Sequence, residues 1–278
     1  MTKEQDIRIF QLAKHFLLEE MAKHGLQTDT LDKYLTTGKS STLAQVYKRL
    51  IESGANKERA ANVIKSGTKG GVENMAELLF HFDIHQVLNH YGSDDQALLQ
   101  AIISTFGLSG SINESKQGIW PQWAKNILSG ARFLSKFKDH ADFDRFVISF
   151  PQDDRARNAL PLLLKEEIDG FGIALACDFL KESGYLFYGK PDVYLKVFFQ
   201  HAGLTKTESD YEVMHAINRV ADHNGVTAYA VDKIFWLIGS GKFYLDRDER
   251  TGETLVFKGR EKRKERFLKE VGVHNKPN

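Results

Sequence analysis

The pattern of hydrophobic and polar positions predicts a chain built almost entirely of helices. Residues 4–24 place apolar side chains at helical spacing, and the same pattern continues through most of the chain. The further predicted helices are 42–53, 56–64, 73–91, 94–107, 119–138, 141–149, 153–167, 173–183, 192–202, 208–223, 227–238 and 260–269. A strand-like pattern appears only at 242–246 and 254–257. We therefore expect a mainly α fold with a small β-hairpin near the C-terminus.

Changes in this pattern predict three segments. Lys65–Gly71, rich in Gly and Lys, is the most linker-like stretch, and the apolar positions become denser after it. We interpret it as a plain flexible loop rather than a phosphate contact. The expected segments are an N-terminal helical extension (1–70), a helical core (71–240) and a C-terminal β-hairpin with a basic helix (241–278).

Composition limits the classes of protein to consider. The 278 residues carry a net charge near +1, which argues against a protein that coats DNA through general basicity but leaves room for a local basic face. The one cysteine, Cys177, excludes a disulfide within the chain and a four-cysteine iron–sulfur cluster, and we expect its thiol to be buried. No apolar run is long enough to span a bilayer, and the N-terminus lacks a signal-peptide pattern. We expect a cytoplasmic protein that does not bind membranes.

The histidines do not have the spacing of a metal site. His81 and His85 lie four residues apart, on one face of the helix predicted over 73–91, and would form half of a zinc site. No third ligand accompanies them, so we predict no metal site.

The stretch from Leu160 to Phe199 carries the most specific pattern in the chain. An apolar helix ends at Ile168 and Asp169, Gly170-Phe171-Gly172 forms a tight turn, and a second helix begins at Ile173. Glycines allow positive φ and the close approach of another backbone, and the amides that open a helix are a natural phosphate site. Twenty residues after Gly172, Pro191-Asp192 has the pattern of a helix start.

This hairpin and aspartate resemble the helix-hairpin-helix DNA glycosylase superfamily, known as HhH-GPD, over about forty residues. The resemblance implies two helical subdomains that flank a DNA-binding cleft. It places Gly170, Phe171 and Gly172 in the DNA-binding hairpin and gives Asp192 the catalytic role. Ala174 stands where bifunctional members carry a lysine, which implies an enzyme that uses water and leaves the abasic site intact. The resemblance also implies no cofactor, apart from a monovalent ion that bridges hairpin carbonyls to a phosphate.

The candidate site residues each have a structural alternative. A carboxylate near C1′ stabilises the positive charge that develops as the base departs, or polarises a water, but Asp192 also suits a helix cap. Gly170 and Gly172 also suit an ordinary helix end. Lys165, Lys181, Lys190 and Lys196 surround the hairpin and Asp192 in sequence and are expected to be solvated or to face phosphate, with Ala174 and Lys190 placed against the DNA backbone. A flipped base needs aromatic side chains around its pocket. The candidates are Tyr185, Phe187, Tyr188, Trp120 and Trp123, and the alternative for each is packing in the core.

The leading hypothesis is a monomeric, monofunctional DNA glycosylase acting on an altered base in double-stranded DNA. The altered base is either a lesion, which indicates repair, or a modified base of phage DNA, which indicates defence. The alternatives are a non-catalytic DNA-binding module of the same fold and a helical scaffold for protein interactions. Nothing in the sequence decides between repair and defence, whereas the presence of Asp192 weighs against the non-catalytic module.

Overall fold

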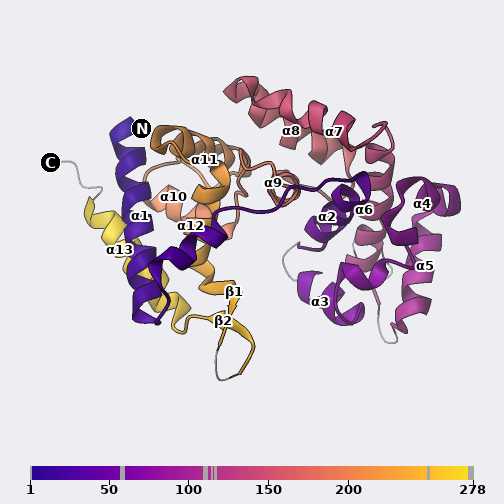
Figure 1. The fold of residues 1–278 in the computed structure, drawn as a ribbon, viewed down its shortest axis with the longest axis horizontal. Coiled ribbons are helices and arrows are strands. Elements are labelled where there is room, and N and C mark those ends of the chain that lie inside the picture. The colour runs from indigo at the N-terminus through magenta and orange to yellow at the C-terminus, as the bar shows by residue number, and fades with distance from the viewer. Residues whose placement is uncertain are drawn as a thin grey trace. The chain divides into compact units, whose positions relative to one another are not determined.

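The computed structural model describes residues 2–56, 60–108, 112–113, 115, 118–248 and 251–274, and helices dominate these ranges (Figure 1). The α-helices are α1 (Lys3–Lys23), α2 (Leu43–Ala55), α3 (Ala60–Gly67), α4 (Ile84–Tyr91), α5 (Asp95–Phe106), α6 (Ile119–Leu134), α7 (His140–Ile148), α8 (Asp154–Glu167), α9 (Ile173–Glu182), α10 (Val193–His201), α11 (Asp210–Asn224), α12 (Ala228–Ser240) and α13 (Arg260–His274). Short 3-10 helices are η1 (Thr28–Tyr34), η2 (Val72–Met75), η3 (Phe80–Phe82) and η4 (Phe150–Gln152).

The predicted mainly α fold with a small β-hairpin is confirmed. Strand β1 (Lys242–Arg247) pairs antiparallel with β2 (Thr254–Val256), with Lys242 opposite Val256. The chain forms two compact units: unit 1 comprises Met1–Gly38 and Gly184–Asn278, and unit 2 comprises Lys39–Ser183. This division differs from the three segments expected from the sequence, because the first 38 residues pack with the last part of the chain.

Unit 1 is organised around α1, which contacts α11, α12 and α13 (Figure 1). The helical spacing of Ile9, Phe16 and Leu17 places these side chains in the same buried core as Phe198 and Phe235. Burying apolar surface is the main force that joins these distant segments.

A buried ion pair adds specificity to this packing. Asp6 of α1 is fully buried and accepts two hydrogen bonds from the Arg219 guanidinium of α11, at 2.8 and 3.1 Å. Its Oδ2 also lies 2.7 Å from Nδ1 of His223. The N-terminal helix is therefore an integral part of unit 1.

In unit 2, α6 lies among α2, α4 and α5, with α2 also contacting α9 and α8 packing on α9. Trp123 of α6 is buried, and its indole N–H donates to the carbonyl of Ile51 in α2 (3.2 Å). Cys177 of α9 is also buried, as expected. The packing of α6 and α8 sets the position of the loop between α8 and α9.

The continuous helix predicted over 73–91 is wrong. Phe80, His81 and Phe82 all have positive φ, at 50°, 54° and 66°, so the chain makes a left-handed turn before α4. The turn is hydrogen bonded, with the amide of His81 donating to Ala76 (2.7 Å) and that of Asp83 to Phe80 (3.0 Å). Successive non-glycine residues rarely adopt this conformation, and helical periodicity in the sequence does not reveal it.

The flexible loop expected at Lys65–Gly71 is also more ordered than predicted. Helix α3 continues to Gly67, and Thr68 is fully buried. The Thr68 hydroxyl donates to Ile64 (2.8 Å) and accepts from the amide of Gly71 (2.9 Å). The segment is a hydrogen-bonded turn. The predicted start of the third helix near Asn56 falls partly on residues 57–59, which lie outside the described residues.

None of the helices in the described ranges has the length and apolar character needed to cross a lipid bilayer.

Candidate active site

Asp192 is the N-cap of α10. Its Oδ1 accepts hydrogen bonds from the amides of Tyr194 (2.9 Å) and Leu195 (3.2 Å), as an N-cap carboxylate does. Pro191 is buried beside it, while Asp192 is partly exposed. The helix start and the capping role are therefore present in the structure. Because Oδ1 makes both capping bonds, Oδ2 is the oxygen outside the cap.

A second carboxylate lies beside Asp192. Asp232 is on α12, is 1% exposed, and its Oδ2 accepts a hydrogen bond from the backbone amide of Lys190 (3.0 Å). The backbone approaches α12 very closely here, because a Cβ on Gly189 would lie 2.7 Å from the carbonyl oxygen of Ala228. The loop that leads to Asp192 is thus pressed onto the first turns of α12.

This environment changes the acid–base chemistry of Asp192. Burial, and after it the negative charge of Asp232, raises the pKa of Asp192 to about 6. The amides of Leu195 and Tyr194 and the charge of Lys190 act in the opposite direction. A carboxyl group with a pKa near neutrality can hold or accept a proton at physiological pH, which suits a general base or a group that stabilises developing positive charge.

The predicted glycine hairpin is present between α8 and α9. Gly170 has φ of 79°, a left-handed conformation that favours glycine, and the amide of Phe171 donates to Ile168 (3.1 Å). Gly172 is the N-cap of α9, and no side chain caps that helix. The amides of the first turn of α9 therefore remain available for an anion such as phosphate.

Polar side chains of α6 hold the entry to this hairpin. The amide of Asp169 donates to the Ser129 hydroxyl (2.9 Å), and the Asn126 side-chain amide donates to the carbonyl of Asp169 (3.1 Å). Both side chains are 3% exposed. Sequence analysis did not identify Asn126 and Ser129, although two polar residues three positions apart within an apolar helix stripe were a usable signal. They fix both backbone polar groups of Asp169, the residue before Gly170.

The hairpin belongs to unit 2, whereas Lys190 and Asp192 belong to unit 1. Phe171 is buried and packs near Phe179, with ring centroids 6.3 Å apart, so only its backbone is suited to a DNA contact. Ala174 is partly exposed in the first turn of α9. The structure brings together Lys190, Asp192 and Asp232, and it was Asp232 that the sequence analysis missed.

The rings predicted as base-pocket walls are mostly interior. Tyr185, Tyr188, Trp120 and Trp123 are all buried, and Phe187 is partly exposed. A stacking wall needs an accessible ring face, so this burial favours the core-packing alternative for the four buried residues.

Two of the four lysines near the hairpin and Asp192 are paired with acids. Lys181 is buried, not solvated, and its ammonium lies 3.2 Å from Glu182 and 3.8 Å from Asp178. Lys196 is paired with Asp210 at 2.5 Å. Lys165 is exposed, as predicted.

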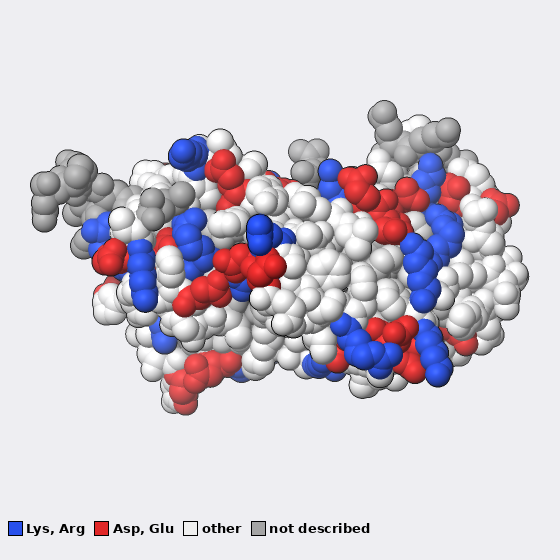
Figure 2. All heavy atoms as spheres, turned by 90° about the horizontal axis from the view of Figure 1, so that it is seen from above, with Lys and Arg blue, Asp and Glu red and all other residues white. Residues whose placement is uncertain are grey.

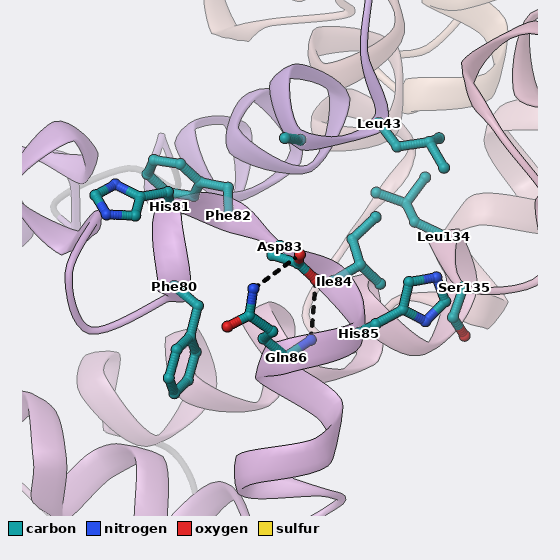
Figure 3. Close-up of a pocket in the computed structure, with 11 residues that line it drawn as sticks. Leu43, Phe80, His81, Phe82, Asp83, Ile84, His85, Gln86, Leu134 and Ser135 are labelled. Carbon is teal, nitrogen blue, oxygen red and sulfur yellow. Dashed lines mark hydrogen bonds between the residues drawn. The ribbon is translucent and has the colours of Figure 1, made fainter.

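Unit 2 contains a pocket of about 440 Å³ where the left-handed turn meets α4, α2 and the end of α6 (Figure 3). His81 lies in the turn and His85 in the first turn of α4, so the two do not share a helix face as the sequence suggested. Gln86 donates to Asp83 twice, from its backbone amide to Oδ1 and from its side-chain Nε2 to Oδ2, both at 3.0 Å. Among the described residues, no group of three or more His, Cys, Asp or Glu side chains is placed to hold a metal ion.

Charges of both signs alternate on the face of the molecule shown in Figure 2, where lysines and arginines lie beside aspartates and glutamates. Many of the basic side chains are paired, for example Lys136 with Glu167 at 2.5 Å and Arg132 with Asp169 at 3.7 Å. This interleaving is consistent with the near-neutral net charge.

No family model matches the chain, and no curated protein matches it. Among solved structures, the chain is similar to the Methanocaldococcus jannaschii 8-oxoguanine glycosylase/lyase in complex with a 15mer DNA containing 8-oxoguanine. The two chains are 15% identical, and the match covers 80% of this chain and 94% of the other, with a TM-score of 0.48. A likeness at this distance does not assign an activity.

Proposed function

We propose that this chain is a monofunctional DNA glycosylase that hydrolyses the N-glycosidic bond of an altered base and leaves an abasic site. The observation that carries the proposal is the Asp192 carboxyl group, partly exposed at the start of α10 with its pKa raised to about 6. Perturbed carboxyl groups of this kind are typical of catalytic positions. The glycine hairpin at the spacing of the HhH-GPD pattern supports the same proposal.

In this mechanism Asp192 acts in its ionised form. As the base leaves, positive charge develops on the deoxyribose, and a carboxylate close to C1′ stabilises that charge or orients the attacking water. The capping bonds to Oδ1 hold the group in place, so its orientation does not have to be fixed during the reaction.

The hairpin is proposed to bind the DNA backbone through main-chain groups. Gly170, Gly172 and the uncapped first turn of α9 offer amides to a phosphate, and a monovalent ion is proposed at the hairpin carbonyls. The absence of a lysine at Ala174 supports hydrolysis by water without strand cleavage, because a Schiff-base step requires an amine nucleophile. The proposed substrate is a damaged base or a modified base of phage DNA.

The test incubates the pure protein with duplexes that carry alkylated, oxidised or deaminated bases, including 8-oxoguanine, and with phage DNA that carries modified bases. Strand breaks are scored with and without hot alkali. We expect breaks only after alkali treatment, which detects abasic sites. Breaks without alkali would contradict the monofunctional mechanism. Salt-sensitive DNA binding without any breaks would indicate the non-catalytic module, and no DNA binding would indicate a scaffold.

The substitution Asp192→Asn tests the assigned residue. Asparagine retains an oxygen that can cap α10 but cannot carry the negative charge, so we expect base release to fall at least about 100-fold while DNA affinity stays within about threefold. Single-turnover base release and equilibrium DNA binding measure the two effects. Undiminished base release by the variant would refute the role of Asp192.

A further inference from the structure

Asp232 is a buried acid that the proposed chemistry does not use. It lies in the second turn of α12, among apolar neighbours that include Val231 and Ile234, and only 1% of its surface is exposed. A buried carboxylate is costly unless hydrogen bonds or charges compensate for the lost water. If α12 served only for packing, an apolar side chain would suit this buried position better than a carboxylate. The hydrogen bonding of Asp232 therefore indicates its role.

Asp232 is hydrogen bonded to the loop that leads to Asp192. The amide of Lys190 donates to Asp232 Oδ2 (3.0 Å), and the amide of Asp192 donates to the carbonyl of Lys190 (2.9 Å). One turn earlier on the same helix, the amide of Tyr229 donates to the carbonyl of Leu186 (3.0 Å). The loop is therefore attached to α12 at both ends, and Asp232 makes the attachment that is nearer to Asp192.

Gly189 allows this attachment. A Cβ at this position would lie 2.7 Å from the carbonyl oxygen of Ala228 and 3.2 Å from Cβ of Asp232, so only glycine brings the loop close enough for the Lys190 amide to reach the carboxylate. Gly189 thus allows the close approach of the loop to α12, and the Lys190 amide makes the hydrogen bond to Asp232.

We infer that Asp232 is a positioning residue for Asp192: it fixes the Lys190 peptide through a hydrogen bond and places a second negative charge beside the Asp192 carboxyl group. This inference rests on the proposed function in one respect, because it names the residue that sets the geometry and protonation of the proposed catalytic group. The two contributions, a hydrogen-bond acceptor and a charge, are separable by substitution.

Charged groups of α11 and α13 also lie around α10. Lys196 pairs with Asp210 of α11, and the ammonium of Lys264 of α13 lies 6.0 Å from the ring centroid of Tyr194. Lys190 is the cation that lowers the pKa of Asp192, while Asp232 is the neighbouring acid that raises it. Removing the charge of Asp232 should therefore shift the titration of Asp192 in one direction, toward lower pH.

The test is a titration of the aspartate carboxyl groups by carbon-13 NMR in the full-length protein, with Asp192 assigned through Asp192→Asn. Asparagine at position 232 retains an acceptor oxygen but lacks the charge, so we expect Asp232→Asn to lower the midpoint of Asp192 by about one pH unit or more. Asp6→Asn is the matched control, because Asp6 is another fully buried acid of unit 1, bound to Arg219 and not to the loop. It should leave the midpoint unchanged.

The acceptor is tested separately by hydrogen exchange at the Lys190 amide. Asp232→Leu should accelerate exchange at least about tenfold, whereas Asp232→Asn should stay within about threefold of the original protein. An unchanged Asp192 midpoint in Asp232→Asn, or unchanged Lys190 exchange in Asp232→Leu, would overturn the inference. If Asp232→Leu does not fold, the Asp192 midpoint measured in Asp232→Asn still tests the inference.

Neither readout requires base release, so failure of this inference is distinct from failure of the proposed function. With a cleavable DNA substrate, the rate of base release should decrease at low pH as Asp192 becomes protonated. In Asp232→Asn the midpoint of this decrease should move to lower pH by the same amount as the NMR midpoint. If this midpoint did not change in Asp232→Asn while base release still depended on Asp192, the positioning role would be contradicted.

Discussion

Asp192 combines a structural role with a proposed catalytic one. Its Oδ1 caps α10, which favours the charged carboxylate, while burial and Asp232 favour the neutral acid. The second influence is larger, so the pKa of Asp192 rises to about 6 from the ordinary 3.8. The residue is thus poised between its two protonation states near neutral pH, and this has consequences for both activity and stability.

Base release is expected to follow the ionisation of Asp192. The rate should be nearly independent of pH above about 7 and should fall as the pH decreases through about 6, because protonation removes the negative charge that the mechanism uses. Single-turnover rates between pH 4.5 and 8 measure this limb. A rate that stays constant down to pH 4.5 would contradict an essential carboxylate with this pKa.

The same pKa predicts that Asp192 destabilises the folded protein near neutral pH. A carboxyl group whose pKa is higher in the folded state binds more protons there than in the unfolded state, so its contribution to stability decreases as the pH rises from about 4 to about 6. Asp192→Asn should raise the free energy of unfolding by up to about 3 kcal/mol above pH 7, since one pKa unit corresponds to about 1.4 kcal/mol. Urea unfolding at pH 7.5 and pH 4 measures the difference, which should nearly vanish at pH 4.

At the scale of elements, the hairpin depends on α6 as much as on its own glycines. Ser129 and Asn126 bind the amide and the carbonyl of Asp169, respectively. The glycines allow the turn, but the buried side chains of α6 determine where it lies within unit 2. A hairpin positioned in this way presents the first turn of α9 with little loss of conformational freedom when a phosphate binds.

Ser129→Ala should therefore loosen the hairpin. Leaving the Asp169 amide without its buried acceptor costs about 1–3 kcal/mol, and we expect faster amide exchange at Asp169 and DNA affinity reduced by about threefold to tenfold. Ser135→Ala is the matched control. The Ser129 hydroxyl donates to the carbonyl of Asn126 (3.2 Å) and the Ser135 hydroxyl to that of Arg132 (2.9 Å), but the Ser135 bond is exposed to solvent. Equal effects of the two substitutions on DNA affinity would count against this role of Ser129.

For the whole molecule, the N-terminal helix is a structural part of unit 1. Its apolar face shares a core with α10, α11, α12 and α13, and Asp6 binds Arg219. The expectation that 1–70 forms a separate extension follows from the linker-like composition of Lys65–Gly71. The contacts instead place residues 1–38 with 184–278.

Deletion of residues 1–38 should unfold unit 1 while unit 2 stays folded, because the deletion exposes the core of unit 1 and leaves α2–α9 complete. Trp236 reports on unit 1, while Trp120 and Trp123 lie in unit 2. Replacing Trp120 and Trp123 with Phe makes fluorescence specific for Trp236. Unchanged Trp236 emission and unchanged unfolding after the deletion would refute an essential role of the N-terminal segment.

Features that depend on neighbouring residues could be predicted from the amino-acid sequence. Helical spacing located most helices, alternation located the β-hairpin, and turn and capping residues located Gly170, Gly172 and Asp192. These signals are local, because backbone preference and capping act within a few residues. The break at Phe80–Phe82 could not be predicted in this way, because the apolar spacing continues through the left-handed turn.

Which distant residues share an environment became clear from the folded chain. The fold buried Tyr185 and Tyr188 in unit 1, joined α1 to the C-terminal helices, and placed Asp232 against the loop before Asp192. These are contacts between residues 40 to more than 200 positions apart, as with Lys190 and Asp232 or Asp6 and Arg219. Burial and electrostatic coupling depend on distance in space, so the pKa of Asp192 is set by the folded chain and not by the residues next to it in sequence.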